Sequence, residues 1–194
     1  AAQNNSDVTG ISTGFIDLDY RTAGLQPSDL ILIAARPSMG KTAFALNIAE
    51  NVAMINHIPT AIFSLEMSKV QLAKRLVAMN SKVDSQRIRI GELEDDEWAK
   101  ITESSIILGE STLYIDDTGS ISINDLRSKC RKLKMEKGLG LIIIDYLQLM
   151  SGNSGSKNIS RQQEISDISR SLKSLARELD CPVIALSQLS RKVE

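Results

Sequence analysis

The segment from Ala35 to Thr42, ARPSMGKT, combines residue types that suit phosphate binding. It follows an apolar run and precedes a helical pattern, which is the context that a Walker A loop requires. Backbone N–H groups at such a turn can surround phosphate oxygens, and the positive end of the helix dipole favours them. We expect Lys41 to reach the β- and γ-phosphates of a nucleotide and Thr42 to offer its hydroxyl to Mg²⁺. Ala35 replaces the usual first glycine, and a strand–helix turn that contains GKT by coincidence is the alternative.

A second signal is Leu141–Asp145, in which four apolar residues end in a carboxylate. A buried parallel strand carries its last side chain to the carboxyl edge of the sheet, where ligands bind in open α/β folds. We therefore expect Asp145 to hold Mg²⁺ as a Walker B acid, an assignment that gains its strength from the Walker A loop upstream. The predicted nucleotide-binding residues are Ala35, Arg36, Pro37, Ser38, Met39, Gly40, Lys41, Thr42 and Asp145, with Thr42 and Asp145 as the magnesium ligands.

Two further strand ends carry candidate catalytic groups. An ATPase of this kind needs a carboxylate to polarise the attacking water, and Tyr146 and Leu147 follow Asp145, so no glutamate stands beside it. Glu66, in the segment FSLEM, is the best-placed base, although a solvated acid beside a helix is the alternative. Gln188 ends another apolar run and could contact a γ-phosphate, or could equally be an ordinary polar residue at a strand end.

The elements that must position these groups alternate along the chain. Short apolar runs occupy Leu30–Ala35, Thr60–Ser64, Thr112–Asp116, Leu141–Asp145 and Pro182–Leu186, and helical patterns occupy 41–56, 68–80, 94–108, 122–137 and 161–179. Capping boxes mark two helix starts, Ser68 with Gln71 and Ser122 with Asp125. Strands buried on both faces and alternating with helices predict an α/β fold, with a parallel sheet flanked by helices on both faces.

Composition narrows the class of protein. The 194 residues suit one domain, and 42% hydrophobic with 24% charged residues is typical of a soluble protein. The longest apolar run, Leu30–Ala35, is far too short to cross a membrane, and no secretory signal is visible. Cys130 shares an apolar helical stripe and is expected to be a buried, reduced thiol. These features point to the cytoplasm.

The net charge of −1 gives no general attraction for nucleic acid, so any DNA contacts must come from local loops or from assembly of several copies. The basic residues of helix 122–137 are expected to form a solvated face.

Residues 1–10 look like a linker remnant, and 11–194 form the predicted core. The Gly/Ser-rich stretch 151–160 is expected to be a loop.

Several segments together resemble one family. TGISTGFIDLD (9–19), ARPSMGKTAFALNIA (35–49), FSLEM (63–67), IIIDYLQLM (142–150) and SRQQEISDISRSLKSLARELDCPVIALSQLSR (160–191) are similar to successive motifs of the DnaB-type hexameric replicative DNA helicases. The resemblance covers nearly the whole chain from Thr9. Related RecA-like proteins share the Walker loops but are not expected to carry ARPSMGKT, DYLQLM and ALSQLSR together.

The resemblance implies a RecA-like P-loop ATPase core that acts in a ring of six and binds ATP with Mg²⁺ at subunit interfaces. Single-stranded DNA would pass through the ring with 5′-to-3′ polarity as duplex DNA is unwound at the replication fork. By the family's pattern, Lys41 and Thr42 bind nucleotide and Mg²⁺, Glu66 is the catalytic base, Asp145 is the Walker B acid and Gln188 senses the γ-phosphate. The family's strand order places Leu141–Asp145 beside Thr60–Ser64.

The resemblance also implies partners. Loop 151–160 occupies the position of the family's first DNA-binding loop, which makes Lys157 and Arg161 candidate phosphate contacts, with a plain linker as the alternative. Primase and a helicase loader are the implied protein partners. The family's N-terminal collar and its arginine finger have no counterpart in these residues, so the sequence is interpreted as part of a longer protein.

Two rival functions are conceivable for a RecA-like ATPase core. A recombinase-type RecA-like ATPase, which does not unwind duplexes, would be expected to depart from the segments DYLQLM and ALSQLSR, which are present here. An assembly module that binds ATP without hydrolysing it would have no need for both Glu66 and Asp145.

Overall fold

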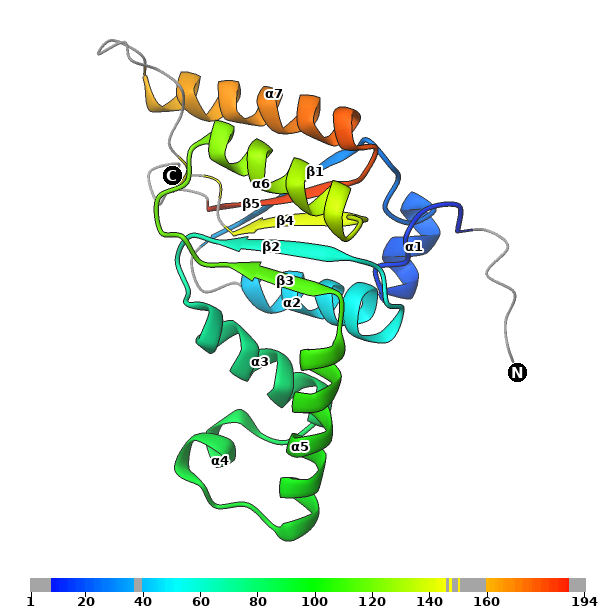
Figure 1. Ribbon diagram of the computed structural model, residues 1–194, viewed down its shortest axis with the longest axis vertical. Helices are drawn as coiled ribbons and strands as arrows, with labels where there is room; N and C mark the ends of the chain where they lie inside the picture. The colour runs from blue at the N-terminus through cyan, green and yellow to red at the C-terminus, as the bar shows by residue number, and fades with distance from the viewer. Residues whose placement is uncertain (1–7, 37–39, 146, 148–149, 151–159, 189–194) are drawn as a thin grey trace.

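The computed structural model describes residues 8–36, 40–145, 147, 150 and 160–188. Within them, five parallel strands form one sheet in the order β1-β5-β4-β2-β3 (Figure 1). The strands are β1 Leu30–Ala35, β2 Thr60–Ser64, β3 Leu113–Asp116, β4 Leu141–Asp145 and β5 Val183–Gln188. The helices are α1 Ile16–Thr22, α2 Lys41–Ala49, the π-helix η1 Glu50–Ile55, α3 Lys69–Ser81, α4 Ser85–Ile90, α5 Asp95–Glu110, α6 Ile123–Glu136 and α7 Arg161–Leu179.

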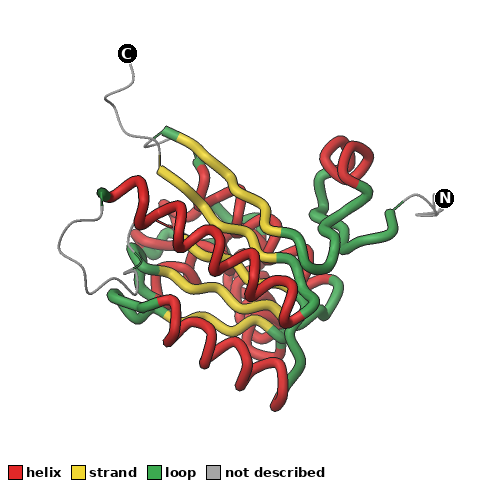
Figure 2. The backbone as a smooth tube through the Cα atoms, turned by 90° about the horizontal axis from the view of Figure 1, so that it is seen from above, coloured by secondary structure: helices red, strands yellow, loops and turns green. Residues whose placement is uncertain are grey.

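The sheet is covered on both faces, as the sequence predicts. Helices α6 and α7 lie over one face, while α2, η1 and α3 pack against the other (Figures 1 and 2). Successive residues of the central strand β4 divide between these two cores, with Ile142 and Ile144 in the first and Ile143 in the second. This division explains why the central strands are continuous apolar runs, because a strand covered on both sides needs apolar side chains at every position.

The register of β4 fixes the relation between two predicted site segments. Strand β4 pairs with β2 so that Asp145 lies opposite Ser64. The placement of Leu141–Asp145 beside Thr60–Ser64 is therefore confirmed, and the strand end at Asp145 adjoins the turn that carries Glu66.

Some local expectations were wrong. Strands β1 and β3 are only partly buried, because they lie at the two edges of the described sheet, and Leu32 is 53% exposed. The predicted helix 41–56 changes at Glu50 into the π-helix η1, and β5 continues to Gln188. Helices α1 and α4 were not predicted, since each spans fewer than two full turns and too few residues to show a helical period.

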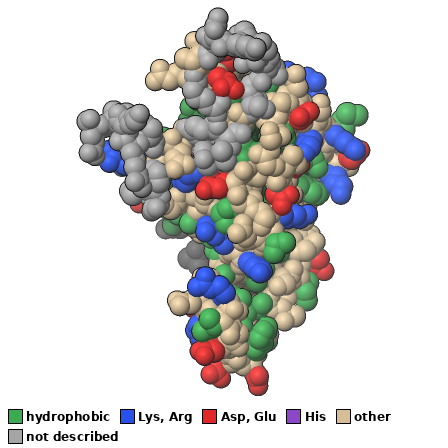
Figure 3. Space-filling view, turned by 90° about the vertical axis from the view of Figure 1, so that its left-hand side faces the viewer, with side chains coloured by type: hydrophobic (Ala, Val, Ile, Leu, Met, Phe, Trp, Pro, Cys, Tyr) green, Lys and Arg blue, Asp and Glu red, His purple; other side chains and the backbone are tan. Residues whose placement is uncertain are grey.

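Helices α3, α4 and α5 form a ledge that projects from the sheet (Figure 1). Helix α4 buries no residue, and Ser104 is the buried residue of α5. Figure 3 shows acidic side chains at the tip of this ledge, where α5 begins with Asp95, Asp96 and Glu97. Among the described helices, none has both the length and the apolar character needed to span a bilayer.

The two cysteines are free and buried in the core beneath α6 and α7, which confirms the reading of Cys130. Burial raises the pKa of the Cys130 thiol to about 12 and that of Cys181 to about 11. Because the thiolate is the reactive form, we expect neither thiol to react with a disulfide reagent at pH 8 in the folded protein. Both should react after unfolding in guanidinium, and fast labelling of either cysteine before unfolding would contradict this packing.

Candidate active site

The predicted site residues meet at the carboxyl edge of the sheet. Ala35, where the predicted Walker A loop begins, lies opposite Gln188, and β5 in turn pairs with β4, whose last residue is Asp145. Asp145 faces Ser64, two residues before Glu66. Parallel strands place all their carboxyl ends on one side, so four segments distant in sequence adjoin here, as ligand sites of open α/β sheets require.

The start of α2 is suited to an anion. Gly40 is the N-cap residue with φ 77°, in the left-handed region that favours glycine, and no side chain of the described residues caps the helix. The first N–H groups of a helix have no intrahelical acceptor, so they remain available to a ligand. A Cβ atom added to Gly40 would meet no atom within 4 Å among the described residues. Pro37, Ser38 and Met39 lie outside the described residues.

Lys41 and Thr42 both contact Asp145, the predicted Walker B acid. The Lys41 Nζ atom lies 2.9 Å from Asp145 Oδ1, and the Thr42 hydroxyl donates to Asp145 Oδ2 over 2.9 Å. Asp145 is 3% exposed and the Lys41 side chain 10% exposed. A buried carboxylate needs such partners to offset the loss of water. Lys41 and Thr42, which the sequence assigned to phosphate and metal binding, therefore meet at the predicted metal ligand Asp145.

The donor set fits magnesium bound together with a nucleotide. Thr42 Oγ1 and Asp145 Oδ2 are both oxygen donors, which Mg²⁺ prefers, and they already adjoin. The described residues contain no group of three or more His, Cys, Asp or Glu side chains that could hold a metal ion. Mg²⁺ usually keeps several waters and binds through one or two protein ligands plus substrate phosphates. The site is therefore suited to Mg²⁺ that arrives with phosphate.

Glu66 lies on a short turn between β2 and α3. Its side chain is exposed, while the backbone N–H of the preceding Leu65 donates to the Asp145 carbonyl over 2.8 Å. The turn is thus tied to the strand that ends in Asp145. This arrangement places an acid beside Asp145 on a neighbouring strand end.

The sequence of the chain matches a known family. A family model described as the DnaB-like helicase C terminal domain matches residues 10–194. The chain belongs to this family. The replicative DNA helicase DnaB of Geobacillus stearothermophilus is 57% identical over 190 residues, which cover 98% of this chain and 42% of that protein.

Solved structures agree with this DnaB-like assignment. The structure of a DnaB-like replicative helicase and its interactions with primase matches with a TM-score of 0.89 and 41% identity, over 97% of this chain and 45% of that one. The ATPase domain of a protein named G40P matches with a TM-score of 0.89 and 41% identity, over 96% of this chain and 66% of that one. The fold is RecA-like, as predicted, and the chain spans less than half the length of the Geobacillus relative.

Of the two DNA-contact residues predicted for this DnaB-like domain, only the backbone of Arg161 lies within the described part of the chain. Lys157 lies outside the described residues. The backbone of Arg161 begins α7, which Ser160 caps by accepting from the Gln163 N–H, but the Arg161 side chain is also outside the description. Strand β4 ends at Asp145 and α7 begins at Arg161, and residues 151–159 of the predicted loop lie outside the described residues.

Three basic side chains of α6 are tied to neighbours within the DnaB-like domain. Lys129 pairs with Asp116 over 2.7 Å, Arg131 pairs with Glu178, and Lys134 donates to the Leu139 carbonyl. Burial acts to raise the pKa of Asp116, but hydrogen bonds from Lys129 and Thr118 outweigh it and the pKa is lowered.

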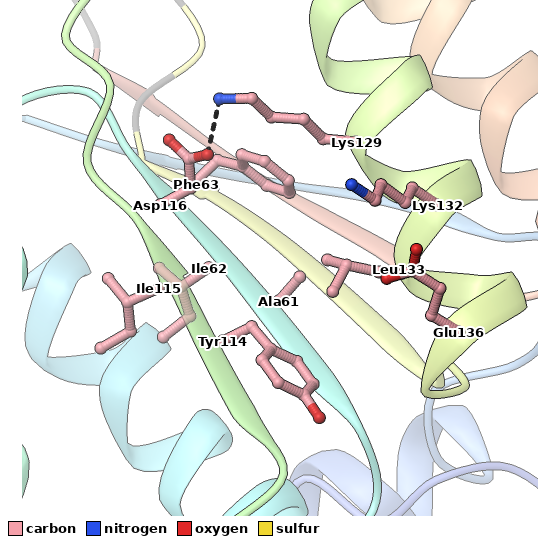
Figure 4. Close-up of a pocket in the computed structure, with 10 residues that line it drawn as sticks. All are labelled: Ala61, Ile62, Phe63, Tyr114, Ile115, Asp116, Lys129, Lys132, Leu133 and Glu136. Carbon is pink, nitrogen blue, oxygen red and sulfur yellow. Dashed lines mark hydrogen bonds and ion pairs between the residues drawn. The ribbon is translucent and has the colours of Figure 1, made fainter.

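A mostly apolar groove of about 320 Å³ lies between α6 and the edge strand β3. Figure 4 shows Asp116 and Lys129 at one end, Tyr114 at the other, and Leu133 of α6 along the wall. The groove is lined by neither Lys41 nor Asp145, so it is separate from the candidate active site.

Proposed function

We propose that this chain is the ATPase motor of a replicative DNA helicase, which hydrolyses ATP to move 5′ to 3′ along single-stranded DNA and unwind duplex DNA at the replication fork. The observation that carries the proposal is the convergence of Lys41 and Thr42 on the buried Asp145. Membership of the DnaB-like family supports it, because the relatives are replicative DNA helicases.

Each residue has a distinct task in the proposed hydrolysis. Lys41 leaves Asp145 to make a charge-assisted contact with the β- and γ-phosphates. Thr42 and Asp145 hold Mg²⁺, which when bound neutralises charge on the phosphate oxygens. Glu66 accepts the proton of the attacking water, and its exposure leaves it reachable by that water. Gln188, at the end of β5, contacts the γ-phosphate and reports its presence.

Hydrolysis in a ring also needs a positive group to stabilise the transferring phosphoryl, a contribution of about 10³–10⁵ in rate for arginine fingers. We propose that the neighbouring subunit of a homohexamer supplies this group. Primase is a further proposed partner, which the solved relative with its primase interactions supports. A helicase loader is proposed from the family resemblance.

Unwinding polarity tests this function. The full-length protein, given ATP and Mg²⁺, should displace the strand of a forked substrate that offers a 5′ tail for loading, and should fail on a substrate with a 3′ tail alone. ATP hydrolysis with no displacement on either substrate would favour a recombinase-type ATPase. Binding of ATP with no hydrolysis would favour an assembly module.

A second experiment tests the DNA contacts. Replacing Lys157 and Arg161 with alanine should weaken single-stranded DNA binding and flatten its salt dependence, because each lost phosphate contact reduces the slope of log K against log [salt] by about 0.7 for single strands. The ATPase rate without DNA should barely change. A variant whose affinity for single-stranded DNA is unchanged across the salt titration would indicate that loop 151–160 is a plain linker.

A further inference from the structure

The turn that carries Glu66 is held by its backbone. The Glu66 side chain is exposed and makes no hydrogen bond or ion pair with the described residues. Leu65, just before it, is tied to the Asp145 carbonyl. The position of the Glu66 carboxylate therefore depends on how firmly the backbone of the turn is held. Two side chains outside the predicted Walker motifs, Ser64 and Asp117, form hydrogen bonds with that backbone.

Ser64 closes the turn from the inside. Its hydroxyl donates to the Met67 carbonyl over 2.7 Å and accepts from the Met67 N–H over 3.2 Å. The residue is 1% exposed and lies directly opposite Asp145 in the sheet. The Ser64 hydroxyl thus both donates to and accepts from the backbone of Met67, the residue that follows Glu66. These two hydrogen bonds join the two ends of the turn.

Asp117 holds the far side of the turn. Its Oδ2 atom accepts from the Lys69 N–H over 2.8 Å, where α3 begins. That amide has no acceptor within the helix, and a carboxylate near a helix N-terminus is favoured by the helix dipole. The sequence shows no capping pattern for this bond, because 48 residues separate the partners.

The loop that presents Asp117 is itself anchored. Asp116 accepts from the Thr118 N–H over 2.9 Å and pairs with Lys129 of α6 (Figure 4). A series of contacts therefore connects α6, the end of β3 and the start of α3. Because β2 lies between β4 and β3, these contacts hold the turn on the side opposite to Asp145.

We propose that Ser64 and Asp117 are positioning residues that hold Glu66 in place for attack by water on the γ-phosphate. The inference rests on the proposed role of Glu66 as the base. Neither residue touches the nucleotide in this account, so both act on the rate of hydrolysis and leave nucleotide binding to the Walker loops. Small displacements of a reacting group are costly, since a misplacement of about 1 Å can reduce a rate by about 10²-fold.

The test is steady-state ATPase kinetics of the full-length protein. Asp117→Ala should lower kcat by about tenfold, within the range expected for misplacement, and change KM for ATP by less than about twofold. Asp117→Asn keeps an oxygen that accepts from Lys69 and should restore kcat. Ser64→Ala should resemble Asp117→Ala. An Asp117→Asn variant as slow as the alanine variant would overturn the positioning role, because loss of charge would then be the cause.

Asp84→Ala is the matched control. Asp84 is also exposed and caps a helix, accepting from the N–H groups of Gln86 and Arg87, but the helix that it precedes is α4 in the ledge. It should lower thermal stability as much as Asp117→Ala without changing kcat. An equal fall of kcat in both variants would show a general loss of stability and would overturn the proposal.

Glu66→Gln separates this inference from the proposed function. If Glu66 is the base, that variant is nearly inactive, and adding Asp117→Ala to it should produce no further fall in the single-turnover rate. A normal rate in Glu66→Gln would overturn both claims. A collapsed rate in Glu66→Gln with unchanged kcat in Asp117→Ala and Ser64→Ala would leave Glu66 as the base and overturn the positioning role alone.

Discussion

Replacing Lys41 with alanine is expected to abolish ATP turnover in the full-length protein. Lys41 supplies the charge-assisted contact to the phosphates, and removing one preorganised donor from a reaction centre typically costs about 10²–10³ in rate. Nucleotide affinity should fall as well, since the contact exists before the chemical step. Isothermal titration with ADP and Mg²⁺ and a steady-state ATPase assay measure the two effects. Unchanged turnover would remove the Walker A assignment.

The same change should lower stability without nucleotide. Asp145 is buried, and its 2.9 Å contact to Lys41 would be lost while the hydrogen bond from the Thr42 hydroxyl is kept. Removing one partner of a buried polar group costs about 1–3 kcal/mol of the free energy of unfolding.

Lys173→Ala is the control for the effects of Lys41→Ala on turnover and ADP affinity. Lys173 contacts the Ser28 carbonyl and Asp29, before β1 begins, and its loss should change neither turnover nor ADP affinity.

Replacing Glu66 with glutamine should separate binding from hydrolysis. Glutamine preserves the shape of the side chain but cannot accept the proton, so turnover should fall by about 10²–10⁴-fold, the usual contribution of a general base. ATP and Mg²⁺ should still bind, because Lys41, Thr42 and Asp145 are untouched. Equilibrium binding and turnover must be measured on the same preparation.

A parallel fall of affinity and turnover would show that Glu66 is structural. Glu103→Gln provides the matched control, because Glu103 is an exposed glutamate on α5 within the ledge. It should leave both quantities unchanged.

The fold was predictable because its central elements carry strong local signals. The limits of the central strands β2 and β4 match the predicted runs, and α7 begins and ends where the periodicity does. A strand buried on both faces leaves an unmistakable apolar run, and a long amphipathic helix repeats its pattern several times. The candidate site was predictable for the same reason, since Lys41, Thr42 and Asp145 stand at the ends of these elements.

The features that were missed depend on tertiary contacts. Ser64 reads as the last residue of a strand and Asp117 as a loop residue, yet each closes the turn around Glu66. The Lys41–Asp145 pair joins residues 104 positions apart, and its contact depends on the register of the sheet. Partial exposure of β1 and β3 likewise follows from their places at the sheet edges, which chain order alone does not reveal.

A crystal structure of the protein with ADP and Mg²⁺ tests the central claim most directly. We predict phosphate oxygens at the backbone amides of Gly40, Lys41 and Thr42, with the Lys41 ammonium moved from Asp145 to the phosphate. We also predict Mg²⁺ at about 2.1 Å from the Thr42 hydroxyl, with Asp145 beside it directly or through water. Nucleotide bound elsewhere, or Lys41 still paired with Asp145 while the phosphates lie away from α2, would contradict the account.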